Sequence, residues 1–323
     1  HLVTIERIGA LDIWMTLKKA LDLYPDRVAV VDGDRSFTYA EIGDRVGGLA
    51  RWFQAQAILP ADRISILEVN SHAFLETYFA AAGIGAILNP LNYRLAAREI
   101  AYILNDSGTR WLVAGSCFAP VVKGVLDEDT PLKGIIWIDD PPDDSAKVTV
   151  FSYEDAIKSH RGAFEPVTLN ENDVAHLYYT SGTTGRPKGV MLTHKNVCLH
   201  ALGTIAELKL VDSDIWGHIA PMFHLADAWA TFAITWVGGR HVMVGQFEPE
   251  TVMATIEQQR ITLSNLIPTM LNLMIKHPRV AEFDYSSLRV ILSGGAPIAP
   301  QVVKSITEAF SCDYIQTYGM TET

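Results

Sequence analysis

The chain has 323 residues, which at about 150 residues per domain predicts two domains or one large one. Hydrophobic residues make up 49% and charged residues 20%, a globular composition that excludes disorder as the main state. The 26 basic residues are outnumbered by 37 acidic ones, a formal net charge of −11, so we expect no nucleic-acid partner.

Signals for a membrane or for export are missing from the sequence. The longest apolar stretches, 78–90 and 228–239, are too short to cross about 30 Å of hydrocarbon, so we predict no transmembrane segment. The first ten residues contain Glu6 and Arg7 and lack a signal-peptide core. The 3 cysteines are widely spaced without a CxxC pair, which favours a reducing compartment, and we expect a cytoplasmic protein. A homodimer is possible on these data.

Strand-like and helix-like segments alternate from the beginning of the chain. Short β-branched or apolar runs predict strands, and apolar residues recurring on one face predict helices. In chain order we expect a strand at 28–31, a strand at 36–39, a helix at 40–56, a strand at 64–69, a helix at 73–87, a strand at 110–114 and a strand at 174–179. Gly83 and Gly85 lack the third glycine of a dinucleotide loop and predict close helix packing instead.

The same alternation continues in the second half. We expect a strand at 215–221, a buried helix at 228–237, a strand at 240–244, a helix at 250–259, a strand at 263–267, a helix at 269–276, a strand at 288–292 and a helix at 298–310. This order predicts an α/β fold of two lobes, with mainly parallel sheets flanked by helices. We place the lobes approximately at 1–177 and 178–323, and we detect no internal sequence repeat.

The stretch 178–190, with the sequence YYTSGTTGRPKGV, carries the clearest chemical signal. Its residues 180–185 are all Gly, Ser or Thr and follow the strand predicted at 174–179. Glycines let a backbone approach an anion closely, and hydroxyl groups add donors without charge repulsion. Arg186 and Lys188 then supply positive charge, so the stretch predicts a polyphosphate-binding loop. A Walker loop is excluded because Gly185 is followed by Arg186 and Pro187 rather than by Lys and Ser or Thr.

This stretch resembles the phosphate loop of the AMP-forming, adenylate-forming superfamily, which includes acyl-CoA synthetases. Further segments resemble the superfamily's motifs in the same order; they are Leu192-Thr193-His194-Lys195-Asn196, Pro221-Met222-Phe223-His224, Ser293-Gly294-Gly295-Ala296-Pro297 and Thr317-Tyr318-Gly319-Met320-Thr321-Glu322. The resemblance covers essentially the whole chain, as part of a large N-terminal adenylation domain. The chain ends in a Gly/Thr-rich loop, so we expect the rest of that domain and a small C-terminal domain to lie beyond residue 323.

The resemblance implies roles for these residues in binding ATP, Mg²⁺ and a carboxylic acid. The β- and γ-phosphates would be held by Thr180, Ser181, Gly182, Thr183, Thr184, Gly185 and Lys188. Adenine would stack on Tyr318, next to Gly319, in a pocket walled by Gly295, Ala296 and Pro297. Glu322 would bind Mg²⁺ and Thr321 the α-phosphate, so the catalytic set would be Thr180, Lys188, His224, Thr321 and Glu322. The acid would meet His224, Asp227, Trp229, Gly294, Thr317 and Met320.

The implied activity is ligation of a carboxylic acid to CoA, the acceptor substrate, through an acyl-adenylate with release of pyrophosphate. His224 disfavours an α-amino acid, where the superfamily commonly has Asp, and we favour a medium- or long-chain fatty acid. An aryl acid, transfer to a carrier-protein thiol and a non-catalytic nucleotide-binding module are the alternatives, and a kinase is disfavoured by the missing Walker step. The superfamily's ribose Asp, hinge Arg and catalytic Lys match no residue here, so we expect the 323-residue chain alone to adenylate poorly.

Overall fold

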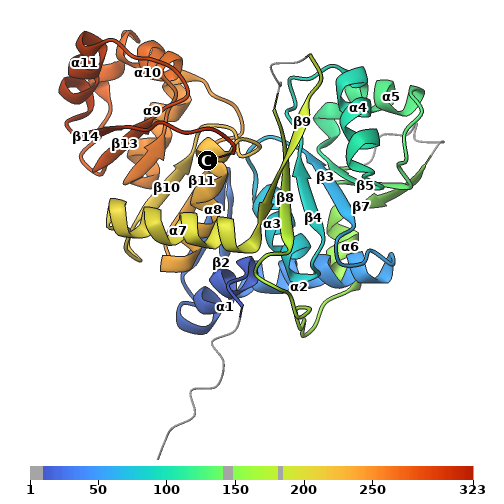
Figure 1. Ribbon diagram of the computed structural model, residues 1–323. Helices are drawn as coiled ribbons and strands as arrows, with labels where there is room; N and C mark the ends of the chain where they lie inside the picture. The colour runs from blue at the N-terminus through green and yellow to red at the C-terminus, as the bar shows by residue number, and fades with distance from the viewer. Residues whose placement is uncertain (1–9, 141–147, 181–184, 323) are drawn as a thin grey trace, which may run out of the picture.

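The computed structural model describes residues 10–140, 148–180 and 185–322, and Figure 1 shows the chain as two lobes built on two sheets. We call the first sheet sheet I. Its strands are β3 (Arg63–Leu67), β4 (Ile87–Pro90), β5 (Trp111–Ala114), β6 (Gly134–Trp137), β7 (Thr149–Ser152), β8 (Val174–Thr180) and β9 (Lys188–Thr193). Their order in space is β7-β6-β5-β3-β4-β8-β9, and all neighbours are parallel except the β8/β9 hairpin.

Sheet II has the same number of strands. These are β1 (Val28–Asp32), β2 (Arg35–Thr38), β10 (Ile215–His218), β11 (Arg240–Met243), β12 (Leu263–Asn265), β13 (Val290–Ser293) and β14 (Asp313–Gln316). Their order is β14-β13-β12-β10-β11-β1-β2, again parallel except for one hairpin, β1/β2. Position by position, this order repeats that of sheet I. The fold therefore contains a topological repeat that the sequence does not reveal.

Helices connect the strands and flank the sheets. The helices before β8 are α1 (Ile13–Leu23), α2 (Tyr39–Ala55), α3 (His72–Gly83), α4 (Ala97–Ser107), α5 (Ala119–Asp127) and α6 (Tyr153–Ser159). Those after β9 are α7 (His194–Leu208), α8 (Leu225–Val237), α9 (Pro249–Gln259), α10 (Pro268–Ile275) and α11 (Pro300–Phe310). In the part of the chain that the structure describes, no helix is long and apolar enough to cross a membrane.

The predicted fold class is confirmed, and every strand and helix predicted from the sequence has a counterpart. Several element boundaries differ by a few residues, and three differences from the prediction have a clear structural reason. The helix predicted at 73–87 ends at Gly83, because Gly85 takes a left-handed φ of +72° and the chain turns into β4. The strand predicted at 215–221 ends at His218, because the Ala220 carbonyl and the Met222 N–H bond to the Asn70 side chain instead of to a neighbouring strand.

The third difference concerns the lobes. The chain does not divide at 177/178, because β9 pairs with β8 in sheet I and the early strands β1 and β2 complete sheet II. The lobes are therefore interleaved along the sequence. The predicted close helix packing at Gly83 is present, since a Cβ there would lie 3.0 Å from Trp14 Cε3 of α1.

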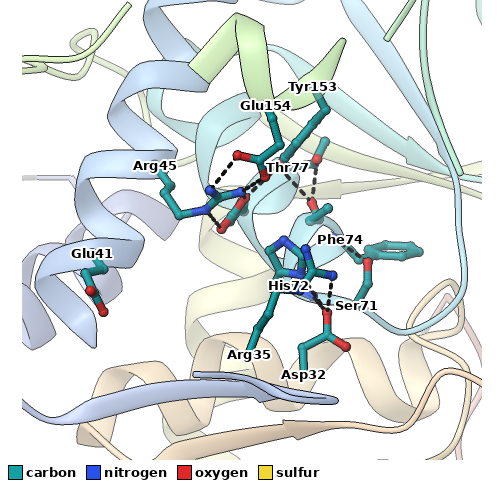
Figure 2. Close-up of polar contacts among 12 residues, drawn as sticks. Asp32, Arg35, Glu41, Arg45, Ser71, His72, Phe74, Thr77, Tyr153 and Glu154 are labelled. Carbon is teal, nitrogen blue, oxygen red and sulfur yellow. Dashed lines mark hydrogen bonds and ion pairs between the residues drawn. The ribbon is translucent and has the colours of Figure 1, made fainter. Parts of the chain in front are cut away.

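Polar side chains tie the lobes together at α3. In Figure 2, Arg45 on α2 faces Glu154 on α6, and Asp32 at the end of β1 faces His72 at the start of α3. The Arg45 guanidinium also bonds the fully buried Glu76 of α3, with 2.6 Å from Nε to Oε1. Asp32 Oδ2 lies 2.6 Å from His72 Nδ1 and accepts the His72 backbone N–H. These bonds fix α3 against both sheets.

Candidate functional site

Three of the predicted motif segments follow strands of sheet II and lie at one edge of it. His224 follows β10, residues 294–297 follow β13 and residues 317–322 follow β14. Because β10, β12, β13 and β14 are parallel neighbours, their carboxyl ends share one edge. The chain leaves β10 first toward β11 and later crosses to β12, so a topological switch point lies between β10 and β12. Crevices of this kind are where open α/β sheets bind ligands.

Two of these segments touch directly. The Thr317 N–H donates to the Ser293 carbonyl at 2.7 Å, and the Thr317 hydroxyl donates to the same carbonyl at 3.1 Å. A Cβ at Gly294 would lie 2.9 Å from the Thr317 carbonyl oxygen, so only glycine fits there. Gly295 has a left-handed φ of +77°. Glycine at both positions therefore lets the exits of β13 and β14 meet.

Beyond this contact the predicted nucleotide residues lie open to solvent. The Tyr318 side chain is 96% exposed. Ala296, Pro297, Gly319 and Glu322 are exposed as well, and Thr321 is half-buried. Met320 is 57% exposed. Figure 1 shows the segment after β14 running back from the outer edge of the molecule toward its centre. An aromatic ring so exposed can take a planar ligand on its face.

His224 is the N-cap residue of α8 and lies on the surface. Its ring is 4.4 Å from that of Phe223, centroid to centroid. The surrounding protein atoms and then the positive charge of Arg94 lower the pKa of His224. The imidazole is therefore neutral near neutral pH and can donate one hydrogen bond without carrying charge.

Sequence reasoning missed Arg94. Its guanidinium lies over the Tyr93 ring at 5.0 Å and over the Phe223 ring at 5.9 Å. Arg94 follows β4, at the carboxyl edge of sheet I, and reaches the segment that carries His224. The run 78–90 is apolar throughout, so the sequence pattern showed neither the end of α3 nor the strand β4. Without β4, the pattern offered no reason to place Arg94 at the end of a strand.

Asp227, predicted to meet the acid, points into the core. It is fully buried, and its two carboxylate oxygens bond Trp216 Nε1 at 3.2 Å and His218 Nδ1 at 2.5 Å. His218 Nε2 continues to His241 Nδ1 at 2.9 Å. The carboxylate thus joins the first turn of α8 to β10. It does not face the surface on which His224 lies, so any effect on the acid is indirect.

Trp229 is half-buried, and its position is fixed by its neighbours. Its Nε1 donates to the Ala226 carbonyl at 3.1 Å, and its ring packs edge-on against Trp216 at 4.8 Å and against His200 at 6.1 Å. The side chain is therefore held by Trp216, His200 and Ala226 while it stays partly accessible.

The predicted phosphate loop lies at the tip of the β8/β9 hairpin. Thr180 ends β8 and pairs with Lys188, which begins β9 and is exposed. Gly185 is exposed with a left-handed φ of +91°. Ser181, Gly182, Thr183 and Thr184 lie outside the described residues. The Lys188 ammonium group and the Thr180 hydroxyl group thus lie at the two strand ends that flank the loop.

For Mg²⁺, the described residues offer a single predicted carboxylate, Glu322, and no cluster of three or more His, Cys, Asp or Glu side chains. Mg²⁺ commonly keeps several waters and takes one or two carboxylates together with substrate phosphates. An exposed lone glutamate fits an ion that is delivered with a nucleotide.

Comparison with known proteins agrees with this arrangement. Residues 17–323 match the family described as AMP-binding enzyme. The chain belongs to this family. Feruloyl-CoA synthase of Amycolatopsis sp. is 35% identical over 302 residues, which cover 92% of the chain and 57% of that protein. The long-chain-fatty-acid–CoA ligase FadD13 of Mycobacterium tuberculosis is 30% identical over 312 residues, or 96% of the chain and 60% of the ligase. The chain thus spans little more than half the length of these AMP-binding enzymes.

Solved structures give the same family and fold. The N-terminal domain of FACL13 from Mycobacterium tuberculosis matches with a TM-score of 0.84 and 30% identity, covering 96% of the chain and 76% of that domain. The anthranilate–CoA ligase AuaEII, solved with anthranoyl-AMP, has a TM-score of 0.90 at 24% identity over 96% of the chain and 60% of the ligase, a likeness of fold alone. The resemblance to acyl-CoA synthetases is therefore confirmed.

Proposed function

We propose that the protein is an AMP-forming acid–CoA ligase, and that the carboxyl edge of sheet II is its adenylation site. The observation that carries this proposal is the meeting of the β13 and β14 exits through Thr317 and Ser293, on the edge where β10 delivers His224. This geometry, the phosphate hairpin and the family match all support it. Because the chain spans about 57% of its relatives, the activity is proposed for the whole protein.

The nucleotide roles follow from exposure and chemistry. Tyr318 stacks on adenine against the wall of 295–297, and Thr321 contacts the α-phosphate. Lys188 and the loop from Thr180 to Gly185 hold the β- and γ-phosphates, because a lysine beside Gly, Ser and Thr neutralises charge while backbone donors fix position. Glu322 would hold Mg²⁺, which would supply positive charge against the phosphates.

The chemistry needs positioning more than a protein nucleophile. A carboxylate oxygen attacks the α-phosphorus of ATP, and the bond to the β-phosphate oxygen breaks to release pyrophosphate. The sulfur of CoA then attacks the acyl carbon, AMP leaves with the carboxylate oxygen, and the thiol proton passes to solvent. Attack by one anion on another requires neutralised charge and an aligned approach. Neutral His224, with a lowered pKa, can orient the acid through one N–H.

Among acids, we propose a medium- or long-chain fatty acid first. The half-buried or exposed start of α8 offers small residues, such as Ala226, on which an alkyl chain could lie, and the 30% identical FadD13 is a long-chain-fatty-acid–CoA ligase. An aryl acid is the second candidate, favoured by the 35% identity to a feruloyl-CoA synthase and by the rings of Tyr93 and Phe223 near His224, with Trp229 further along α8. A carrier-protein thiol could also replace CoA as acceptor.

The test is product analysis of the whole protein with Mg-ATP, CoA and matched panels of fatty and aryl acids. We expect AMP and pyrophosphate in equal amounts with one class of acid, and thioester only when CoA is present. A thioester formed on a carrier protein but not on CoA would show that the acceptor is the carrier-protein thiol. Formation of ADP, or no acid-dependent turnover with any acid, would contradict the proposed function and favour a kinase or a nucleotide-binding module.

A further inference from the structure

A buried chain of hydroxyl groups joins the phosphate hairpin to the segment that carries His224. Tyr78 on α3 donates its hydroxyl proton to the Met222 carbonyl at 2.9 Å, and its oxygen lies 2.8 Å from the Tyr178 hydroxyl. Each tyrosine hydroxyl has one proton, and Tyr78 uses its proton in the bond to Met222. Tyr178 is therefore the donor in the bond between the two hydroxyls. Tyr178 lies on β8 two residues before Thr180, and Met222 lies two residues before His224. The bridge therefore spans the two predicted substrate-binding segments.

The same segment is also held by Asn70, which follows β3. Asn70 Nδ2 donates to the carbonyls of His218 and Ala220 at 2.8 and 2.9 Å, and Asn70 Oδ1 accepts the Met222 N–H at 2.8 Å. The exit of β10 is thus bonded through its backbone to lobe I, the helices and strands of sheet I. Its position depends on lobe I as much as on sheet II.

The Tyr78 ring strengthens this connection through packing. It meets His176 of β8 at 5.1 Å and Phe232 of α8 at 5.4 Å, both edge-on. Burial lowers the pKa of His176 to about 3, so its ring is neutral and packs as an aromatic group. One fully buried side chain therefore contacts the strand that leads to the phosphate loop and the helix that His224 caps.

We infer that Tyr78 is a positioning residue for adenylation, fixing the distance between the phosphate-binding hairpin and His224. The inference rests on the proposed function and extends it to a side chain that lies fully buried, between the two lobes and away from the exposed motif residues. A fixed distance between the hairpin and His224 keeps the acid aligned with the α-phosphate. A small misplacement of the reacting groups slows the chemical step more than it weakens binding.

The test is Tyr78→Phe in the whole protein, assayed by acid-dependent exchange of pyrophosphate into ATP. We expect kcat to fall about tenfold while KM for ATP changes less than about twofold, since a misplacement near 1 Å can cost about 100-fold. Tyr39→Phe is the matched control: Tyr39 is equally buried and donates to the Gly239 carbonyl at 2.6 Å, before β11 and so at the opposite edge of sheet II. We expect it to lose similar stability and to keep its kcat.

A double-mutant cycle with His224→Ala separates positioning from mere stability. If Tyr78 acts through His224, the loss caused by Tyr78→Phe shrinks to about twofold or less in the His224→Ala background. Tyr178→Phe leaves the bond to Met222 intact and should give a smaller loss of kcat, about threefold, even if Tyr78→Phe folds poorly. Equal kcat for the Tyr78→Phe and Tyr39→Phe variants, or additive losses with His224→Ala, would overturn the inference. Absence of exchange in the wild-type protein would instead overturn the proposed function on which it rests.

Discussion

Lobe I and lobe II, the second being the helices and strands of sheet II, are built on the same strand order but differ where their chains turn. In sheet II, the β1/β2 hairpin is closed by Gly33 and Asp34, and Gly33 takes a φ of +58°. In sheet I, the sequence between the equivalent strands β8 and β9 is longer, residues 181–187, and rich in Gly, Ser and Thr. The strand exits differ too, because Glu68 follows β3 whereas Ile219 follows β10.

The fold thus contains the same strand order and the same kind of hairpin twice, and the turns and side chains distinguish the two copies. The hairpin that can bind phosphates belongs to sheet I, and the exposed motif segments belong to the edge of sheet II. The proposed adenylation site draws on both segments and so lies between the lobes. Its geometry depends on the buried contacts that hold the lobes together, and these contacts can be tested separately.

The largest effect is expected at two fully buried carboxylates, Glu76 and Asp227. Glu76 on α3 is fully buried against Arg45, and Asp227 on α8 is fully buried against His218. Arg45→Leu leaves Glu76 without its cation, and we expect it to lower the free energy of unfolding by about 3–5 kcal/mol. Asp227→Asn should cost less, because an amide oxygen can still accept from Trp216 Nε1. Chemical denaturation of each variant measures both effects.

A control distinguishes the ion pair from simple loss of packing. Arg45→Leu combined with Glu76→Leu removes both charges, and we expect it to be more stable than Arg45→Leu alone. A double variant at least as unstable as the single one would mean that the stability comes from the shape of Arg45 and not from its charge.

The second prediction compares the two hairpins. Lys188 begins β9 opposite Thr180, as Arg35 begins β2 opposite Asp32. We expect Lys188→Ala to reduce acid-dependent pyrophosphate exchange about 100-fold or more, because it removes charge stabilisation at the phosphates. Arg35 occupies the equivalent position in sheet II, and we expect Arg35→Ala to leave the rate of pyrophosphate exchange unchanged. If both variants lose the same activity, the difference drawn between the hairpins is wrong.

The third prediction concerns Glu68 at the exit of β3. Burial, partly offset by a hydrogen bond from the Val69 N–H, and then the charges of Asp139 and Asp32 raise its pKa to about 7. The folded state therefore favours the protonated acid, so this stabilisation is complete below the unfolded pKa near 4.5 and is lost as the pH rises through 7. The shift corresponds to about 3 kcal/mol.

Glu68→Gln mimics the protonated carboxyl group and tests the predicted direction of the pH dependence of stability. We expect the variant to be more stable than the wild type at pH 8, by up to about 3 kcal/mol, with the difference shrinking toward pH 5. Urea denaturation across this range measures it. A difference that grows as the pH falls would show that Glu68 is ionised and stabilising in the folded protein.

Among the described residues, the sequence predicted nine of the fourteen strands and six of the eleven α-helices, because the periodicity of apolar residues is a local pattern. The sequence singled out His224, Gly294 and Thr317 one by one, but it did not predict that they follow strands that end at the same edge of sheet II. The sequence could not reveal Arg94 or Tyr78, since their partners lie far along the chain: the Tyr78 hydroxyl bonds a residue 144 positions away. Nor could it show that Asp227 points inward, because direction is set by His218 and Trp216.

The smallest effect is expected at two exposed helix pairs. Lys18 and Asp22 on α1 lie 2.8 Å apart, and Lys304 and Glu308 on α11 lie 3.8 Å apart, with more than half of each side chain exposed. We expect Lys18→Ala and Lys304→Ala each to change the free energy of unfolding by less than about 0.5 kcal/mol. Thermal denaturation at low and high salt checks this, and a larger change at either pair would mean that surface charge matters more than the buried contacts suggest.

The most direct measurement of the central claim follows an oxygen atom. The whole protein is supplied with Mg-ATP, CoA and an accepted acid labelled with ¹⁸O in its carboxylate, and the AMP formed is analysed by mass spectrometry. Attack of the carboxylate on the α-phosphate predicts one ¹⁸O atom in each AMP formed. Label in inorganic phosphate together with ADP, or AMP without label, would contradict adenylation at this edge of sheet II.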